Sequence, residues 1–326
     1  MVLKYQLKKF ILILSVLLVC VSLSSCSEKK VSSTELAMNT VISITAYGDK
    51  ADEAVKASFD EVKRIEKLLS CHIEESEISK VNKYAFENPV EVSPETAEVL
   101  KKALLFCEKT KGAFDISVKP LSDLWNIKAE NPKVPSDEQI KNTLSFVGYE
   151  NISLNGNFVS LKKEGVQIDL GGAAKGYCAD KIAEILKSFG IKNALIDLGG
   201  NIYALGKNEQ GKEWRIGLQS PGGKRGEYFS IEELSDKTAV TSGSYERYFE
   251  KDGRVYHHIL DAKTGYPSDS GLISVTVISE NSFEADMLST AIFVMGADEF
   301  EKIKNKFDFE KYITVDKYNV ERVYVK

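Results

Sequence analysis

The spacing of apolar residues predicts helices and strands in mixed order along the chain. Residues 51–69 carry apolar side chains at helical spacing, which indicates an amphipathic helix with its buried face formed by Val55, Phe59, Val62, Ile65, Leu68 and Leu69. A second helix is predicted from Ser93 to about Lys111. Ser93 suits an N-cap, Pro94 suits the first helical position, and Gly112 follows the end.

The remaining elements follow from alternation and from turn residues. Further helices are predicted at 174–189 and 284–295, strands at 38–47, 166–172, 193–200 and 214–220, hairpins at 151–162 and 311–325, and a surface loop at 126–137. Strands and helices do not alternate strictly as in a doubly wound sheet. The pattern therefore favours the α+β class, with mixed sheets, packed helices and one large two-lobed domain.

The N-terminus predicts export. Lys4, Lys8 and Lys9 precede an apolar run, residues 10–23, that is short for a membrane-spanning helix and typical of a signal peptide. The run ends in Leu23-Ser24-Ser25-Cys26, which resembles the lipobox of bacterial lipoproteins and implies cleavage before Cys26 and lipid attachment to its sulfur. The alternative is an uncleaved anchor with an incidental cysteine. Small residues before Cys26 and a polar segment after it favour the lipoprotein.

This interpretation divides the chain into a signal peptide at 1–25, a linker at 26–34 and a domain at 35–326. It predicts a protein that is lipid-anchored to the cell membrane on its extracytoplasmic face. The formal net charge of −5 becomes −8 once the three lysines of the signal peptide are removed. That acidic balance argues against a nucleic-acid partner. Cys71, Cys107 and Cys178 lack CxxC spacing, so we expect buried thiols and no zinc site.

The first candidate for chemistry is a glycine-containing junction at residues 169–176. A predicted strand runs into Gly171-Gly172 and then into the helix that begins near Ala174. Backbone N–H groups and the helix dipole at such a junction suit a phosphate, and Lys175 adds a cation. The spacing matches neither GxGxxG nor a Walker loop, so a tight strand-to-helix turn explains the glycines equally well. A second Asp-Leu-Gly-Gly, at 197–200, is interpreted as a strand-end turn near the ligand.

The second candidate is the pair His257-His258, which follows the segment Thr241–Arg247. Adjacent side chains of a strand point to opposite faces, so only one of the two faces a given site. His258 suits a general base or a phosphate partner. The alternative is a structural histidine with hydrogen-bonded ring nitrogens.

The third candidate is the pair Asp286 and Thr290. The two residues are four positions apart on a predicted helix, so their oxygens share one face. A carboxylate and a hydroxyl are hard-oxygen ligands of the kind that suits Mg²⁺. Taken alone, the pair is explained as well by a charge in the first turns of the helix and a core-facing threonine.

Together these segments resemble the ApbE family, the FAD:protein FMN transferases, over most of the mature chain. Seven motifs occur in the order of the family: Met38-Asn-Thr40, Ser76–Asn82, Gly112–Leu121, Asp169–Tyr177, Thr241–Arg247, His258–Gly265 and Ala285–Ala291.

The resemblance implies which residues hold the ligands. The implied FAD-binding positions are Met38, His72, Ala113, Phe114, Asp115, Asp169, Lys175, Ile259 and Leu260. His72 stands where many members carry an aromatic residue, and an imidazole can still stack on a flavin. The implied metal ligands are Asp286, Thr290 and the backbone carbonyl of Gly172, and His258 falls at the histidine that helps to activate the acceptor hydroxyl.

The implied reaction is Mg²⁺-dependent transfer of the FMN moiety of FAD to a Thr or Ser hydroxyl of an acceptor protein at the membrane surface, with release of AMP. Two alternatives remain open. In one, water replaces the hydroxyl and the protein is an FAD pyrophosphatase that yields FMN and AMP. In the other, the protein is a non-catalytic flavin-binding or solute-binding lipoprotein, which needs neither the Asp286–Thr290 pair nor His258.

Overall fold

The computed structural model describes residues 29–223 and 226–326 of the 326-residue chain. The predicted signal peptide and Cys26 lie outside the described residues. Within the two described ranges, no helix is both long enough and apolar enough to cross a lipid bilayer.

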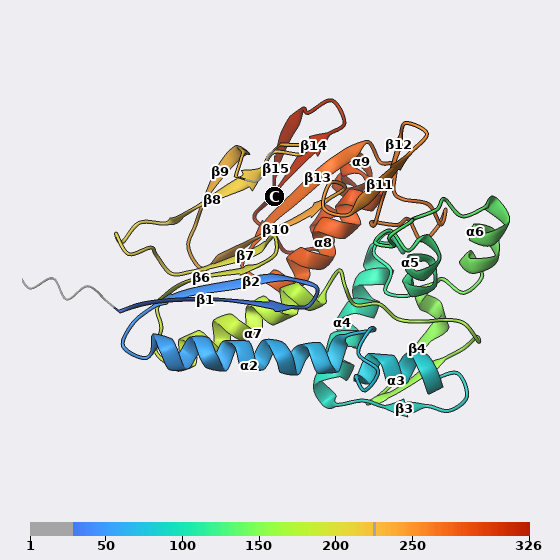
Figure 1. Cartoon of the computed structure of the whole chain (residues 1–326), viewed down its shortest axis with the longest axis horizontal. Helices are drawn as coiled ribbons and strands as arrows, with labels where there is room; N and C mark the ends of the chain where they lie inside the picture. Colours follow the sequence, from blue (N-terminus) through green and yellow to red (C-terminus); the bar gives the residue numbers. More distant parts are fainter. Residues whose placement is uncertain (1–28, 224–225) are drawn as a thin grey trace, which may run out of the picture.

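An eight-stranded sheet forms the centre of the fold, and each strand pairs antiparallel with its neighbours (Figure 1). In spatial order the strands are β1 (Lys30–Ala37), β2 (Thr40–Tyr47), β6 (Asn193–Leu198), β7 (Asn201–Leu205), β10 (Lys237–Gly243), β13 (Leu272–Ser279), β14 (Lys311–Asp316) and β15 (Glu321–Val325). In the inner strands, the alternation of side chains sets an apolar row against the helices, as in the pair Ile44 and Ile196 of β2 and β6.

Three helices cover one face of this sheet and enclose the main core. They are α2 (Ala51–Leu69), α7 (Ala174–Ser188) and α8 (Ser282–Met295), and Figure 1 shows α2 and α7 running beneath β1, β2 and β6. The buried face of α2 contains Val55, Phe59, Val62 and Ile65, as the apolar spacing predicts. A ribbon of β8 (Trp214–Gln219) and β9 (Tyr228–Leu234) covers part of the other face over a separate, smaller apolar cluster.

A second lobe, at the right of Figure 1, contains short helices and a small sheet. The helices are α3 (Glu77–Tyr84), α4 (Pro94–Lys109), α5 (Lys119–Trp125) and α6 (Asp137–Leu144), a 3₁₀ turn spans Tyr149–Asn151, and the sheet consists of β3 (Val90–Glu91), β5 (Phe158–Leu161) and β4 (Ile152–Asn155). The strands β11 (Tyr248–Lys251) and β12 (Arg254–His257) form a hairpin. This hairpin packs against the second lobe, where Tyr256 stacks on Trp125. The helix α9 (Ala297–Glu301) and a 3₁₀ turn at Lys304–Lys306 complete the elements. The α+β class and the two lobes agree with the sequence prediction.

The predicted linker is one point where the structure differs from the prediction. Residues 30–34 were assigned to a linker, yet they belong to β1, the edge strand that pairs with β2. Their polar side chains alternate between exposed and half-buried positions, because an edge strand has few neighbours to bury it.

Residues 166–170 were expected to form a strand, and they do not. The side-chain amide of Asn82 accepts from the N–H of Ile168 (2.6 Å) and donates to its carbonyl oxygen (2.8 Å). The N–H of Asp169 donates to the carbonyl of Ile116 (2.8 Å). A side chain and an isolated loop carbonyl thus satisfy the polar backbone groups that a neighbouring strand would otherwise pair.

Candidate active site

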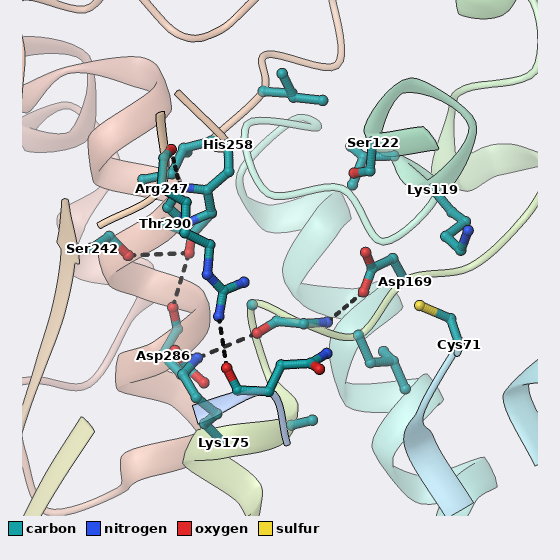
Figure 2. A pocket seen from close by; sticks show the side chains of 18 of the residues that line it. Cys71, Lys119, Ser122, Asp169, Lys175, Ser242, Arg247, His258, Asp286 and Thr290 are labelled. Carbon is teal, nitrogen blue, oxygen red and sulfur yellow. Dashed lines mark hydrogen bonds and ion pairs between the residues drawn. The ribbon is translucent and has the colours of Figure 1, made fainter. Parts of the chain in front are cut away.

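A cavity of about 450 Å³ lies between the two lobes, and all thirteen predicted FAD, metal and catalytic positions line it. Figure 2 shows Lys175, Asp286, Thr290, Arg247 and His258 on one side and Asp169, Lys119 and Cys71 on the other. These residues come from segments that are far apart in the sequence, including the β1–β2 turn, the glycine junction, the end of the β11–β12 hairpin and α8.

The β1–β2 turn enters the cavity in a strained backbone conformation. Met38 and Asn39 both have positive φ, 50° and 58°, so the predicted strand at 38–47 starts only at Thr40. Two successive positive φ angles are typical of a two-residue hairpin turn, where asparagine is common and methionine is not. The N–H of Met38 donates to Glu66 Oε1 (2.8 Å), which holds the turn against the end of α2.

Asp115 shapes a loop of the cavity wall. One carboxylate oxygen accepts from the N–H and the hydroxyl of Ser117 (2.8 and 2.6 Å), and the other accepts from the N–H of Tyr149 (3.0 Å). Burial raises the pKa of Asp115, and the hydrogen bonds from Ser117 and Tyr149 oppose that shift. Both oxygens therefore have partners within the chain, and Asp115 joins the loop at Ser117 to the backbone at Tyr149 beside the cavity.

The glycine junction meets α8 where α7 begins. Ala173 at the N-cap of α7 has no capping side chain, and Asp286 of α8 accepts the N–H of Gly176 with Oδ2 (2.9 Å). The other oxygen, Oδ1, lies 3.5 Å from the ammonium of Lys175, which also donates to the carbonyl of Gly171 (3.3 Å). On the opposite side, Asp169 accepts from the N–H of Gly171 (2.8 Å). The junction thus places the backbone of Gly171 and Gly172 and the ammonium group of Lys175 beside the cavity.

The three predicted metal positions lie together. A Cβ atom on Gly172 would lie 3.4 Å from Thr290 Oγ1, and Thr290 lies one turn beyond Asp286 on the same face of α8. The described residues contain no group of three or more His, Cys, Asp or Glu side chains that could bind a metal. A cation here would therefore rely on one carboxylate, one hydroxyl, backbone carbonyls and phosphate oxygens. These are the hard-oxygen ligands that Mg²⁺ accepts, so the residues fit.

The two adjacent histidines have different environments, as the alternation rule predicts. His257 is buried outside the cavity, its Nε2 donates to the carbonyl of Ser268 (3.1 Å), and its Nδ1 accepts from the N–H of Ile259 (3.3 Å). His258 lines the cavity, and its Nδ1 lies 3.3 Å from the carbonyl of Arg247. Burial lowers the pKa of His258 to about 3, and the charge of Arg247 is the second-largest cause. The ring is therefore neutral at physiological pH.

Three cations of the cavity, Lys119, Lys128 and Arg247, were not assigned a role from the sequence. Lys119 pairs with Asp123 (2.5 Å) and Lys175 lies near Asp286, whereas Arg247 and Lys128 have no carboxylate partner among the described residues. Burial and the charge of Arg247 lower the pKa of Lys128. Arg247 ended a recognised motif, which was a usable signal. Lys128 lies in the polar 126–136 loop, where the sequence does not distinguish it from any surface lysine.

Comparison with known proteins identifies the family. The model of the ApbE family matches residues 38–313. The FAD:protein FMN transferase of Treponema pallidum is 34% identical over 287 residues, which cover 82% of this chain and 79% of the relative. The enzyme of the same name from Haemophilus influenzae is also 34% identical and covers 84% of this chain and 80% of its own.

Solved structures have the same fold. The ApbE protein of Thermotoga maritima aligns with a TM-score of 0.83 at 35% identity, over 90% of this chain and 96% of its own. The flavin transferase ApbE of Vibrio cholerae aligns with a TM-score of 0.82 at 28% identity, over 92% and 97% of the two chains. Sequence and structure therefore agree that this chain belongs to the ApbE family.

Proposed function

We propose that this protein transfers the FMN moiety of FAD to a Thr or Ser hydroxyl of an acceptor protein, with Mg²⁺ as the cation. Relatives that are named FAD:protein FMN transferases align over most of the chain. The observation that carries the proposal is the meeting of the Gly172 junction, the Asp286–Thr290 face of α8 and His258 in one cavity.

Asp286 Oδ1, Thr290 Oγ1 and the carbonyl of Gly172 would hold the cation. When bound, Mg²⁺ supplies positive charge that lowers the barrier to nucleophilic attack at phosphorus. Because Asp286 Oδ2 already accepts from Gly176, the carboxylate offers one oxygen, and the remaining ligands would include oxygens of the substrate diphosphate. Lys175 lies beside this position and would pair with the same diphosphate.

Arg247 and Lys128 would add further positive charge to the anion site. Both line the cavity without an internal carboxylate partner, so an anionic substrate relieves their mutual repulsion. A guanidinium also suits the geometry of phosphate oxygens. The cavity therefore offers Lys175, Arg247 and Lys128 as cations for a bound diphosphate.

His258 would orient the attacking hydroxyl. A carbonyl only accepts, so Nδ1 carries the ring proton toward Arg247 and Nε2 is left as an acceptor. The hydroxyl oxygen bonds to the FMN-side phosphorus, and the bond from that phosphorus to the bridging oxygen breaks. The bridging oxygen leaves with AMP. The hydroxyl proton passes to the AMP phosphate, whose pKa of about 6 exceeds that of the buried imidazole.

The purified protein, FAD, Mg²⁺ and a candidate acceptor test this function. We expect the acceptor to gain the mass of one FMN group while AMP appears in equal amount. Asp286→Ala should abolish transfer and retain metal-free FAD binding, whereas Glu284→Gln, on the same helix outside the cavity, should behave as wild type. Free FMN and AMP with an unmodified acceptor would identify a pyrophosphatase. Bound FAD without turnover would identify a flavin-binding protein.

We also propose that the mature protein is exported and anchored through a lipid on Cys26. The sequence around Cys26 supports this, and β1 begins at Lys30, so only three residues separate the lipid from the folded domain. An acceptor at the membrane surface would then lie within reach of the cavity.

A further inference from the structure

The helices α7 and α8 cap each other. Asp286 of α8 accepts the N–H of Gly176 in the first turn of α7 (2.9 Å). In return, Asp180 of α7 accepts the N–H groups of Ser282 and Phe283 in the first turn of α8 through Oδ1 and Oδ2 (2.9 Å each). Each helix thus supplies a carboxylate to the positive end of the other.

The two helices also touch backbone to backbone at this point. A Cβ atom on Gly176 would lie 2.2 Å from the carbonyl oxygen of Ser282 and 2.8 Å from Asp286 Cβ. Only glycine permits this approach. Because Asp286 and Thr290 lie on the second and third turns of the same helix, a shift of the N-terminal half of α8 moves them relative to Gly172.

Asp180 is costly to the fold in its ionised form. Burial raises the pKa of Asp180 to about 6, and no cation forms an ion pair with it among the described residues, since neighbouring Lys181 pairs with Glu184. Its two oxygens match the two N–H groups of α8. An asparagine offers one acceptor oxygen, so the carboxylate is the side chain that satisfies both donors.

We propose that Asp180 is a positioning residue for the cation site: it fixes the start of α8 against α7 and thereby sets Asp286 and Thr290 at their distance from Gly172. The proposal rests on the cation site of the proposed function. Asp180 does not line the cavity, so it acts through Ser282 and Phe283.

The test measures cation binding directly. Mn²⁺ is titrated into the full mature domain with FAD bound, and free Mn²⁺ is followed by electron paramagnetic resonance. FAD binding without metal is measured by flavin fluorescence.

For Asp180→Asn we expect the Mn²⁺ dissociation constant to rise about tenfold, which is the scale of one lost charge-assisted capping bond. The metal-free FAD affinity should be unchanged. Glu184→Gln removes the same charge from the exposed side of α7 and should change neither constant.

A purely structural role predicts a different outcome. It would lower the melting temperature of Asp180→Asn while leaving the Mn²⁺ constant at the wild-type value, and that result overturns the proposal. If Asp180→Asn does not fold, Asp180→Glu carries the test. Its longer side chain should displace α8 and weaken Mn²⁺ binding, and wild-type Mn²⁺ affinity in that variant would also overturn the proposal. A wild-type protein that binds no Mn²⁺ would instead overturn the cation site itself.

Discussion

His258 Nδ1 lies 3.3 Å from the carbonyl oxygen of Arg247, and this contact leaves Nε2 as the ring nitrogen that can accept a hydrogen bond. The carbonyl requires a donor, so Nδ1 keeps its proton and Nε2 remains an acceptor. The same residue that orients the imidazole also brings its guanidinium beside it, and that charge opposes protonation of the ring. His258 is thereby held in one tautomer and one charge state.

The first prediction concerns the pH dependence of transfer. With a pKa of about 3, His258 is neutral above that pH, so it should add no inflection to kcat/KM between about pH 5 and pH 8. His258→Ala should lower kcat by about 10²-fold because the hydroxyl loses its acceptor, with FAD affinity retained. The measurement is the pH–rate profile of both proteins. An inflection near the ordinary histidine pKa that disappears in His258→Ala would contradict the assignment.

A second prediction addresses the unpaired cations. Arg247→Gln should raise the FAD dissociation constant about tenfold and weaken its dependence on salt, because one charge-assisted contact to the diphosphate is lost. It should also raise the pKa of Lys128, which Arg247 lowers, and NMR titration of the lysine ammonium detects this. Lys251→Gln, an exposed charge on β11, is the control. Unchanged FAD affinity in Arg247→Gln would exclude contact with the diphosphate.

The β1–β2 turn allows a prediction about strain. Met38→Asn places a residue that tolerates positive φ where methionine is strained, so the free energy of unfolding should rise by about 0.5–1 kcal/mol. FAD affinity should fall, since the methionine side chain lines the cavity. Urea denaturation and flavin fluorescence measure the two effects. Leu36→Asn, at an 84% exposed position on the same hairpin, should leave FAD affinity unchanged. A parallel loss in both variants would point to the hairpin as a whole.

Export and lipidation give a prediction that is independent of catalysis. Cys26→Ser should release the protein from the membrane fraction while FMN transfer by the purified domain stays at the wild-type level. Cell fractionation followed by mass spectrometry of the N-terminus measures this. A wild-type N-terminus that still carries residues 1–25 would favour the uncleaved anchor.

The local spacing of apolar residues predicted some helices and strands correctly and others wrongly. The helix α2 spans Ala51–Leu69 as predicted, because its amphipathic spacing is strong and every intrahelical hydrogen bond is local. The apolar residues Val166, Ile168 and Leu170 also alternate as in a strand. In the described structure these residues nevertheless pair with no strand. The side chain of Asn82, 86 residues away from Ile168, occupies their polar groups, and no local signal reveals that contact.

The residues of the candidate site also form two groups, those that the sequence pointed to and those that it did not. The types and spacing of residues marked Asp286 with Thr290, the glycine junction with Lys175, and His258 as candidates, because oxygen ligands on one helix face and glycines before a helix have recognisable periods. The resemblance to the family favoured them over the structural alternatives. Three features had no local signal. They are the cavity-lining position of Lys128, the hydrogen bonds that satisfy both carboxylate oxygens of Asp115, and the capping role of Asp180.

The amino-acid sequence is enough to assign the family and to predict the main helices and strands, and it marks candidate side chains for a diphosphate and a cation. Those inferences follow from local periodicity and from motifs in a fixed order. The meeting of Gly176 and Asp286 at 2.9 Å, 110 residues apart, and the mutual capping of α7 and α8 appear only in the folded chain. A backbone N–H at a helix end can donate to any carboxylate that packing brings within reach, and packing depends on the whole core.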